Sequence, residues 1–592
     1  MLPELVRRKT LDDILHTAEA SPHGLRRALG PVHVTLLGIG GIIGAGIFAT
    51  VGTAAAGDAA RPGAGPSLML SFVLTGLVCA LTALCYAEFA SMVPISGSAY
   101  TYSYATLGEL VAWIIGWDLI LEYAVGNTAV AISWANYFRT LLADVGHLAG
   151  VNLELPRWLC TDYRTAARML DTDGVAYVLR DAPHVFGVPI VVNLLAFFIV
   201  TALTIVLVIG IRESARFNAG MVVIKIVVLA FFVGAAIAFV SPQQMAANWR
   251  PFQPNGWSGT LAGAAIIFFA YIGFDAVSTV AEETRRPSRD IPIGILASLI
   301  ICTIIYVIVA AVFTGLIPYE ALKTRLANEQ AEPLTMALDH VAPQAKWATA
   351  IVAFGSVVAH TAVLLVFQMG QPRIFFSMAR DGLLPPAFAR VHRRFHTPHV
   401  TTILTGVLVG LVSAFANIEE MVDLTNIGTL FAFILVCIGV TVLRYQEPTR
   451  HRAFRVPFGA WLVPMLGAAS CVVLIYYLPP ASWWRFVGWL VLGLAIYFGY
   501  GHSRSALRGR VAQRTPWPLM VASAGFLAAG LGLFVIPHHA TPRELLHAAL
   551  NAGHAQHSAA LIGSVLIVAG LAVSGVCIAA TRPAAGTRTR GL

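Results

Sequence analysis

Charge is scarce in this 592-residue sequence. Asp, Glu, Lys and Arg make up 12% of the chain, whereas about 25% is usual in a soluble domain. Apolar residues make up 57%. This composition excludes an ordinary soluble protein and predicts a polytopic membrane protein. The net charge of +9 does not indicate a nucleic-acid partner, because Lys and Arg are spread among short loops rather than gathered on one face.

Motifs typical of enzymes and metal sites are also missing. The sequence has no His-Glu-x-x-His, no Gly-x-Ser-x-Gly and no acid pair grouped with a nucleophile, so we expect neither catalysis nor a cofactor. Six of the seven cysteines lie in apolar segments and only Cys160 lies in a polar loop, which argues against a disulfide framework or a metal cluster. Residues 1–30 are polar and have no apolar core, so no cleavable signal is expected.

Long apolar runs are what the sequence has in abundance. A helix needs about 20 mostly apolar residues to cross a bilayer, and fourteen runs approach or exceed that length. The predicted spans are 33–57, 68–93, 107–138, 188–210, 216–241, 258–282, 291–317, 347–371, 400–416, 421–443, 458–478, 484–500, 517–536 and 558–580. We therefore predict an all-α polytopic fold with about fourteen spans.

Basic residues between the spans predict the orientation. With the N-terminus inside, 26 Lys and Arg lie in the tails and inner loops and 11 lie in the outer loops, which fits the positive-inside rule. Both termini are therefore expected in the cytoplasm, with the chain in an inner or plasma membrane. The longest polar insertion, 139–187, is then an outer loop. The histidine-rich segment 538–557 is expected to be another, because its spacing matches no tight set of metal ligands.

The stretch Gly38–Phe48 places five glycines in the first span. It misses the dinucleotide-binding spacing and no strand precedes it, so a nucleotide loop is not expected. Two interpretations remain: a face on which helices pack closely, or a helix broken at mid-membrane whose backbone groups bind a solute. A second candidate break, Phe268–Asp275, occurs five spans later. Such a pair indicates two inverted five-helix repeats, spans 1–5 and 6–10, with a binding site between them.

Two broken helices suit the head group of an α-amino acid. The N–H groups that begin the second half of such a helix carry partial positive charge and attract a carboxylate. The carbonyls that end the first half, together with those of span 6, can hold an ammonium group. Glycine lets the solute approach the backbone closely.

Lys225 is the most informative single residue, because it lies well inside span 5. One interpretation is a lysine whose stem lies in lipid while its ammonium reaches the interface. The other is an ammonium that faces the broken part of span 1, in the place of a coupling Na⁺. Burial disfavours the charged form of an amine, so the second interpretation includes release and uptake of a proton during transport.

Other ionisable residues lie within spans. Asp118 and Glu122 are four apart, on one helical face. They either line a proton path or are structural acids. His360, in the middle of span 8, is more typical of a hydrogen-bonded packing histidine than of a proton relay.

Long motifs along the chain support a family resemblance. They are Cys85-Tyr-Ala-Glu88-Phe, Pro94–Tyr104, Gly108-Glu109-Leu, Gly116–Tyr123, Phe269–Asp275, Glu282-Glu283, Asp290–Gly294 and Arg373–Leu384. Together they closely resemble the cationic amino acid transporter family of the amino acid–polyamine–organocation (APC) superfamily. The similarity covers about residues 30–480.

The resemblance implies amino-acid uptake by alternating access around two inverted repeats. We place the segments at 1–32 (cytoplasmic), 33–241 (first repeat), 258–443 (second repeat), 458–580 (four additional helices) and 581–592 (cytoplasmic tail). Carried over by position, the substrate-binding residues are Ile43, Gly44, Ala45 and Gly46 for the carboxylate and Phe269, Ala270 and Ile272 for the ammonium or side chain. Lys225 stands where proton-coupled relatives have a lysine in place of the sodium site. Glu122 is our second candidate for proton coupling.

One departure from the family pattern concerns the substrate. Phe367 stands where we align a small residue in the cationic members, and a phenyl ring there should shorten the pocket. We therefore expect small or medium neutral L-amino acids. Uptake of arginine, lysine or ornithine is the alternative, and a non-transporting amino-acid sensor is an alternative of another class. The expected partners are the amino acid, protons and the lipid bilayer.

Overall fold

The computed structural model describes residues 7–9, 29–58, 60–92, 98–171, 174–210, 215–326, 332–395, 397–508, 517–535, 567 and 570–574. Within these ranges the regular structure is helical apart from a short hairpin, β1 (His184–Val185) and β2 (Val188–Pro189), and three isolated bridges. The prediction of an all-α membrane protein is confirmed. The histidine-rich segment 538–557 and the tail 581–592 lie outside the described residues, as do nearly all of the span 558–580 and residues 94–97 of the motif Pro94–Tyr104.

Helices occupy the predicted first repeat. They are α3 (Pro31–Ile42), η1 (Gly46–Thr50), α4 (Val51–Ala56), η2 (Gly65–Ser67), α5 (Leu68–Met92), α6 (Ser98–Thr106), α7 (Glu109–Ile120), η3 (Leu121–Val125), α8 (Gly126–Ala149), α11 (Leu194–Ile209) and α12 (Ala215–Phe239). Helix α8 runs to Ala149, so about ten residues of the segment predicted as an outer loop are helical. The rest of that loop holds η4 (Arg157–Leu159), α9 (Tyr163–Arg168), α10 (Tyr177–Asp181) and the hairpin.

The predicted second repeat and the helices after it follow the same pattern. From 242 to 446 they are α13 (Pro242–Asn248), α14 (Gly256–Ile267), η5 (Phe268–Tyr271), η6 (Asp275–Glu283), α15 (Pro287–Leu316), α16 (Tyr319–Leu326), α17 (Pro333–Val341), α18 (Lys346–Arg380), η7 (Pro386–Ala389), α19 (His399–Phe415) and α20 (Ile418–Gln446). Beyond them lie α21 (Leu462–Tyr476), α22 (Pro480–Ile496), η8 (Tyr497–Gly501), α23 (His502–Arg504), η9 (Ala506–Arg508) and α24 (Trp517–Val535). Eight helical segments of the described chain are long and apolar enough to cross a membrane, and four further apolar helices are shorter.

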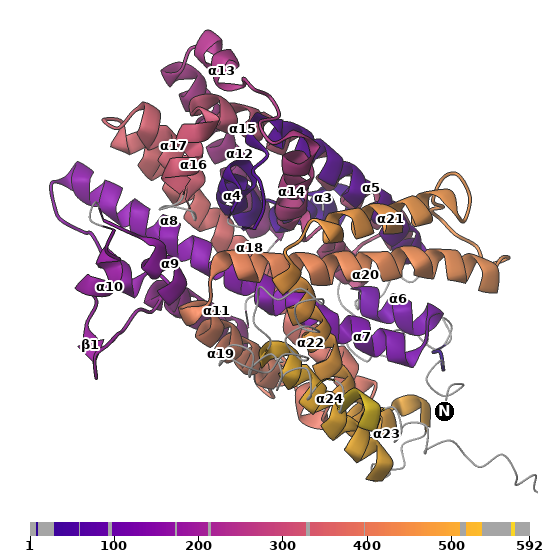
Figure 1. Cartoon of the computed structure of the whole chain (residues 1–592). Coiled ribbons are helices and arrows are strands. Elements are labelled where there is room, and N and C mark those ends of the chain that lie inside the picture. The colour runs from indigo at the N-terminus through magenta and orange to yellow at the C-terminus, as the bar shows by residue number, and fades with distance from the viewer. Residues whose placement is uncertain are drawn as a thin grey trace, which may run out of the picture.

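The two segments that contain the predicted breaks are the most enclosed. Within the most apolar 18 residues of each segment, 83% of the residues of Pro31–Ala56 and 94% of those of Gly256–Ser278 are buried. The corresponding share for Ala219–Phe239 is 33%. Helix α3 packs on α12, α15 and α18, and α14 packs on α4 and α5 (Figure 1). Helices α22 and α24 pack on each other at the edge of the molecule and α22 reaches α7 (Figure 1). The fold therefore places both breaks at its centre.

A substitution at Gly46 tests how closely the two central segments pack. The Cβ of Gly46→Ala would stand 2.1 Å from the Cα of Ala270, and overpacking of this kind costs about 1–3 kcal/mol or more. We expect a lower melting temperature for the purified protein. Gly234→Ala is the matched control, because nothing lies within 4 Å of a Cβ there. Equal melting temperatures for the two variants would contradict this packing.

Candidate functional site

The first central helix is interrupted as predicted. Helix α3 ends at Ile42, and Ile43 is extended, with φ −74° and ψ 103°. The helix resumes at Ala45 and passes through the π-helical turn η1 into α4. The four residues predicted to meet a carboxylate, Ile43–Gly46, are all buried. They lie where the N–H groups of the resumed helix begin, which is a natural position for an anion.

The second central helix is interrupted in a corresponding way. After the 3₁₀ turn η5, Ile272 is extended with ψ 135°. Gly273 follows with φ 116°, a conformation that only glycine adopts readily. Phe269, Ala270 and Ile272, which were predicted to meet the ammonium or side chain, are at most 5% exposed.

The two interruptions lie against each other. Gly46 is so close to Ala270 that there is no room for a Cβ, and Gly41 is in similar contact with the backbone of Gly273. The structure therefore brings the predicted residues of span 1 and span 6 into one place. Glycine is required at these contacts because two backbones approach each other directly.

Lys225 lies at the first interruption. Its Nζ donates hydrogen bonds to the carbonyl oxygens of Gly40 at 2.6 Å and Ile43 at 2.8 Å. The side chain is fully buried, so it does not reach an interface. Among the described residues, no acidic side chain bonds Nζ, and the charge is met by backbone dipoles alone.

Tyr306 of α15 joins the two interruptions and was missed from the sequence. Its hydroxyl lies 2.8 Å from the Ile42 carbonyl oxygen and 3.0 Å from that of Ala270. The only feature of the sequence that could have indicated it is a single tyrosine within an apolar span. Together, Tyr306 and Lys225 supply donors to three carbonyls at the end of the first half-helix, those of Gly40, Ile42 and Ile43.

Phe367 faces span 3 one helical turn from the first interruption. Its ring makes an edge contact with Tyr123, with the centroids 5.7 Å apart. A Cβ at Gly126 would stand 3.3 Å from the Phe367 ring. Val363, four residues earlier on α18, packs on Gly44 in the same manner. Phe367 thus packs against span 3, one helical turn along α18 from the residue that contacts Gly44.

Glu122 does not join Lys225. Its buried carboxyl group lies within electrostatic range of those of Asp275, in the second interruption, and Asp118, and neither of its oxygens accepts a hydrogen bond from a described residue. The Tyr123 hydroxyl donates to Asp275 Oδ2 at 3.4 Å. The sequence placed Asp118 and Glu122 on one face of span 3. It did not associate them with Asp275, because that residue lies in span 6 and no local pattern links the two spans.

His360 is hydrogen-bonded at both ring nitrogens. Nε2 lies 2.7 Å from the Ser133 hydroxyl, and Nδ1 lies 2.6 Å from the Ser356 carbonyl oxygen. The ring also contacts those of Phe48 and Tyr137. These contacts fit the packing histidine that the sequence favoured.

A buried group of three charged residues lies near η1. Arg61, between α4 and α5, pairs with Asp423 of α20 at 2.7 Å and with Asp58 at 2.6 Å. Burial alone would lower the pKa of Arg61, but the two carboxylates raise it above its ordinary value, so the guanidinium stays charged. Arg61 lines a vestibule of about 780 Å³ on one side and a cavity of about 20 Å³ next to η1 on the other. The smaller space holds about one water molecule.

Comparisons with known proteins identify relatives that are transporters. Residues 29–497 match a family model described as amino acid permease. The chain is 42% identical over 508 residues to the branched-chain amino acid permease BcaP of Bacillus subtilis (strain 168), a match covering 86% of this chain and 100% of that protein. It is 40% identical over 506 residues to the methylthioribose transporter of the same bacterium, with the same coverage. It is 36% identical over 449 residues to cationic amino acid transporter 4, vacuolar, of Arabidopsis thaliana, covering 75% of this chain and 68% of that protein.

Proposed function

The chain belongs to the amino acid permease family of the APC superfamily, and from this premise we propose that it imports small or medium neutral L-amino acids by proton-coupled alternating access. The observation that carries the proposal is the pair of interrupted helices in direct contact at the centre of the fold. Amino-acid permeases are transporters, so the expectation that the chain is not an enzyme is confirmed by its family.

The interrupted helices support recognition of the amino-acid head group. The N–H groups that begin at Gly44 bind the carboxylate, because a helix start favours an anion and Ala45 has no hydroxyl to do so. Carbonyls around Phe269 and Ile272 bind the ammonium. Both groups are common to all α-amino acids, so these contacts do not select the side chain.

Selection of the side chain is assigned to Phe367. Its ring packs against Tyr123 and Gly126, one helical turn along α18 from Val363, which contacts Gly44, and we assign to it the limit on side-chain length. A relative named for branched-chain amino acids supports the neutral preference. Relatives named for cationic amino acids support the alternative of arginine, lysine or ornithine. A relative named for methylthioribose shows that about 40% identity does not fix the substrate.

Lys225 and Glu122 are the proposed proton-coupling residues. A protonated Lys225 makes two charge-assisted hydrogen bonds to the end of α3, and loss of the proton would weaken both. Glu122 and Asp275 are interacting carboxyl groups that can share one proton between span 3 and span 6. In this proposal, the protonation state of each group is therefore coupled to the position of an interrupted helix.

Alternating access requires that the Arg61–Asp423 pair opens. Arg61 lines both the wide vestibule and the small cavity beside η1, which supports placing the closed gate of this side at the pair. The distribution of basic residues supports assigning this side to the exterior, with both termini in the cytoplasm. Bacterial relatives support location in the cell membrane.

Counterflow in liposomes tests transport itself. Vesicles loaded with unlabelled L-leucine should accumulate labelled L-leucine when they contain the protein, because a carrier exchanges substrate across the membrane. A parallel series with L-arginine tests the cationic alternative. Binding of an amino acid without exchange of any amino acid would instead favour a sensor.

Replacing Lys225 tests proton coupling. Lys225→Met removes both bonds to the Gly40 and Ile43 carbonyls, and each charged hydrogen bond contributes about 1.5–3 kcal/mol. We expect uptake driven by a pH gradient to fall at least tenfold, while binding measured by thermal stabilisation is retained more fully. Uptake at the wild-type rate with an unchanged pH dependence would remove Lys225 from the mechanism.

Shortening Phe367 tests substrate selection. Phe367→Ser opens space between Tyr123 and Gly126, so we expect uptake of L-arginine and L-lysine to rise relative to L-leucine. Phe375→Ser is the control, because that ring lies two helical turns further along α18 and packs against Phe388 of η7 rather than against span 3. An unchanged order of substrates in Phe367→Ser would show that this ring does not select the side chain.

A further inference from the structure

The segment that joins α20 to α21 is rich in arginine. Residues 447–461, here called the arginine turn, contain Arg450, Arg452 and Arg455 and a single acid, Glu447. The two helices that it joins pack side by side (Figure 1). The distribution of basic residues assigns this turn to the cytoplasmic side of the membrane.

Part of the positive charge of the turn is used inside the fold. The buried carboxylate of Glu88, on α5, pairs with Arg444 and, at 3.2 Å, with Arg452. The backbone N–H of Val456 donates to the same carboxylate at 2.7 Å. Arg452 also donates to the carbonyl oxygen of Arg450 at 2.9 Å. These bonds hold the arginine turn against α5, so its outer surface has a fixed shape.

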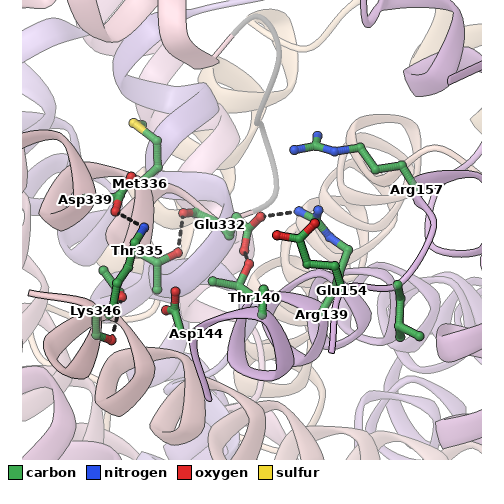
Figure 2. A pocket seen from close by; sticks show the side chains of 13 residues that line it. Arg139, Thr140, Asp144, Glu154, Arg157, Glu332, Thr335, Met336, Asp339 and Lys346 are labelled. Atoms are coloured by element: carbon green, nitrogen blue, oxygen red, sulfur yellow. Dashed lines mark hydrogen bonds and ion pairs between the residues drawn. The ribbon is translucent and has the colours of Figure 1, made fainter. Parts of the chain in front are cut away.

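Arg455 differs from its neighbours in the turn. It is exposed, and no described residue forms a hydrogen bond or an ion pair with its guanidinium. The charge within electrostatic range of it is that of another arginine, Arg452. By contrast, in the polar cavity between α8, α17 and α18, Arg139 is paired with Glu332 at 2.7 Å (Figure 2). Arg455 therefore has its charge available for a partner outside the chain.

Exposed aromatic rings accompany this charge. Phe458, three residues after Arg455, is 78% exposed. Tyr445 and Trp461, at the two ends of the turn, are also exposed, and the Trp461 indole N–H donates to the Tyr445 hydroxyl. Tyr and Trp are enriched where lipid headgroups meet the hydrocarbon of a bilayer. Rings of this kind beside an arginine are typical of a surface that contacts lipid.

The backbone at Phe458 is unusual. Its φ is 59°, in the left-handed region that bulky residues rarely adopt. Such a conformation costs free energy, and it persists where the surroundings fix it or a function requires it. Little of the ring is buried within the protein, so packing inside the fold does not offset that cost. Contact with the apolar part of a lipid would.

We propose that the arginine turn binds an anionic phospholipid of the inner leaflet, with the phosphate at Arg455 and the glycerol and first acyl carbons at Phe458 and Trp461. A guanidinium matches a phosphate with two parallel hydrogen bonds. The anionic lipids of the cytoplasmic leaflet attract arginine and lysine side chains at the surface. The assignment to the inner leaflet rests on the proposed orientation of the chain.

Titration with a short-chain lipid tests the role of the charge. Full-length protein in a non-ionic detergent should melt at a higher temperature as dioctanoylphosphatidylglycerol is added, because a ligand of the folded state stabilises it. Arg455→Gln should raise the lipid concentration that gives half of this shift about fivefold. Arg393→Gln is the control, since Arg393 is also exposed but lies between η7 and α19. It should leave that concentration unchanged.

Phe458→Gly separates lipid contact from a role in the fold. Glycine adopts a positive φ readily, so without lipid this variant should melt at or above the wild-type temperature. It should nevertheless need a higher concentration of phosphatidylglycerol for half of the shift. A lower melting temperature without lipid, together with an unchanged lipid concentration, would show that the ring serves the fold alone and overturn its part in the site.

Two further ligands identify what the site recognises. Dioctanoylphosphatidylcholine has the same chains and phosphate but carries an ammonium group, and it should need at least a fivefold higher concentration. Inorganic phosphate has no chains and should not change the melting temperature at the same concentrations. Equal stabilisation by either of these ligands, no stabilisation by phosphatidylglycerol, or equal effects of Arg393→Gln and Arg455→Gln would overturn the proposal.

Discussion

The structure depends on how the open end of the first half-helix is held inside the membrane. Ending a helix at mid-depth exposes carbonyl groups that water would normally satisfy, and each unsatisfied group costs several kcal/mol in an apolar medium. Lys225 meets two of these carbonyls and Tyr306 meets a third. Their donors come from α12 and α15, so helices distant in sequence must pack in this arrangement for the interruption to exist. The gap is therefore a product of the whole fold rather than of the glycine-rich stretch alone.

Small residues then set how the two interruptions meet. Gly46 against Ala270 and Gly41 against Gly273 leave no space for a further carbon atom. Because the backbones touch there, a side chain at either of these glycines would push the two interruptions apart. Phe367 lies outside this contact, against Tyr123 of span 3.

The sequence was informative where one segment alone carries the signal. Glycines within an apolar run predicted the interruption at Ile43, and depth within a span predicted that Lys225 is buried. It was uninformative where the function depends on pairs of residues far apart in the chain. Three such pairs are Tyr306 with Ala270, Glu122 with Asp275, and Arg61 with Asp423. The two residues of a pair lie up to 362 positions apart in the chain. No local period or motif encodes such pairs, so only the packed structure reveals them.

The kinds of contact around the central helices indicate which helices move together. Hydrogen bonds tie the interrupted segments to α5 and α15: Tyr306 bonds both of them, and Tyr271 donates to the Phe72 carbonyl at 2.8 Å. The contact with α18 at Gly44 is instead apolar, made by Val363. Sliding across an apolar contact breaks no hydrogen bond, whereas separating α15 from either interruption would strand a buried carbonyl. Helices α3, α14, α5 and α15 are therefore the group most easily displaced as one body against α8 and α18. Such a movement would have to break the Tyr137 hydrogen bond to the Phe48 carbonyl near the first interruption and the Tyr123 hydrogen bond to Asp275 near the second, so these bonds restrain the two groups against each other.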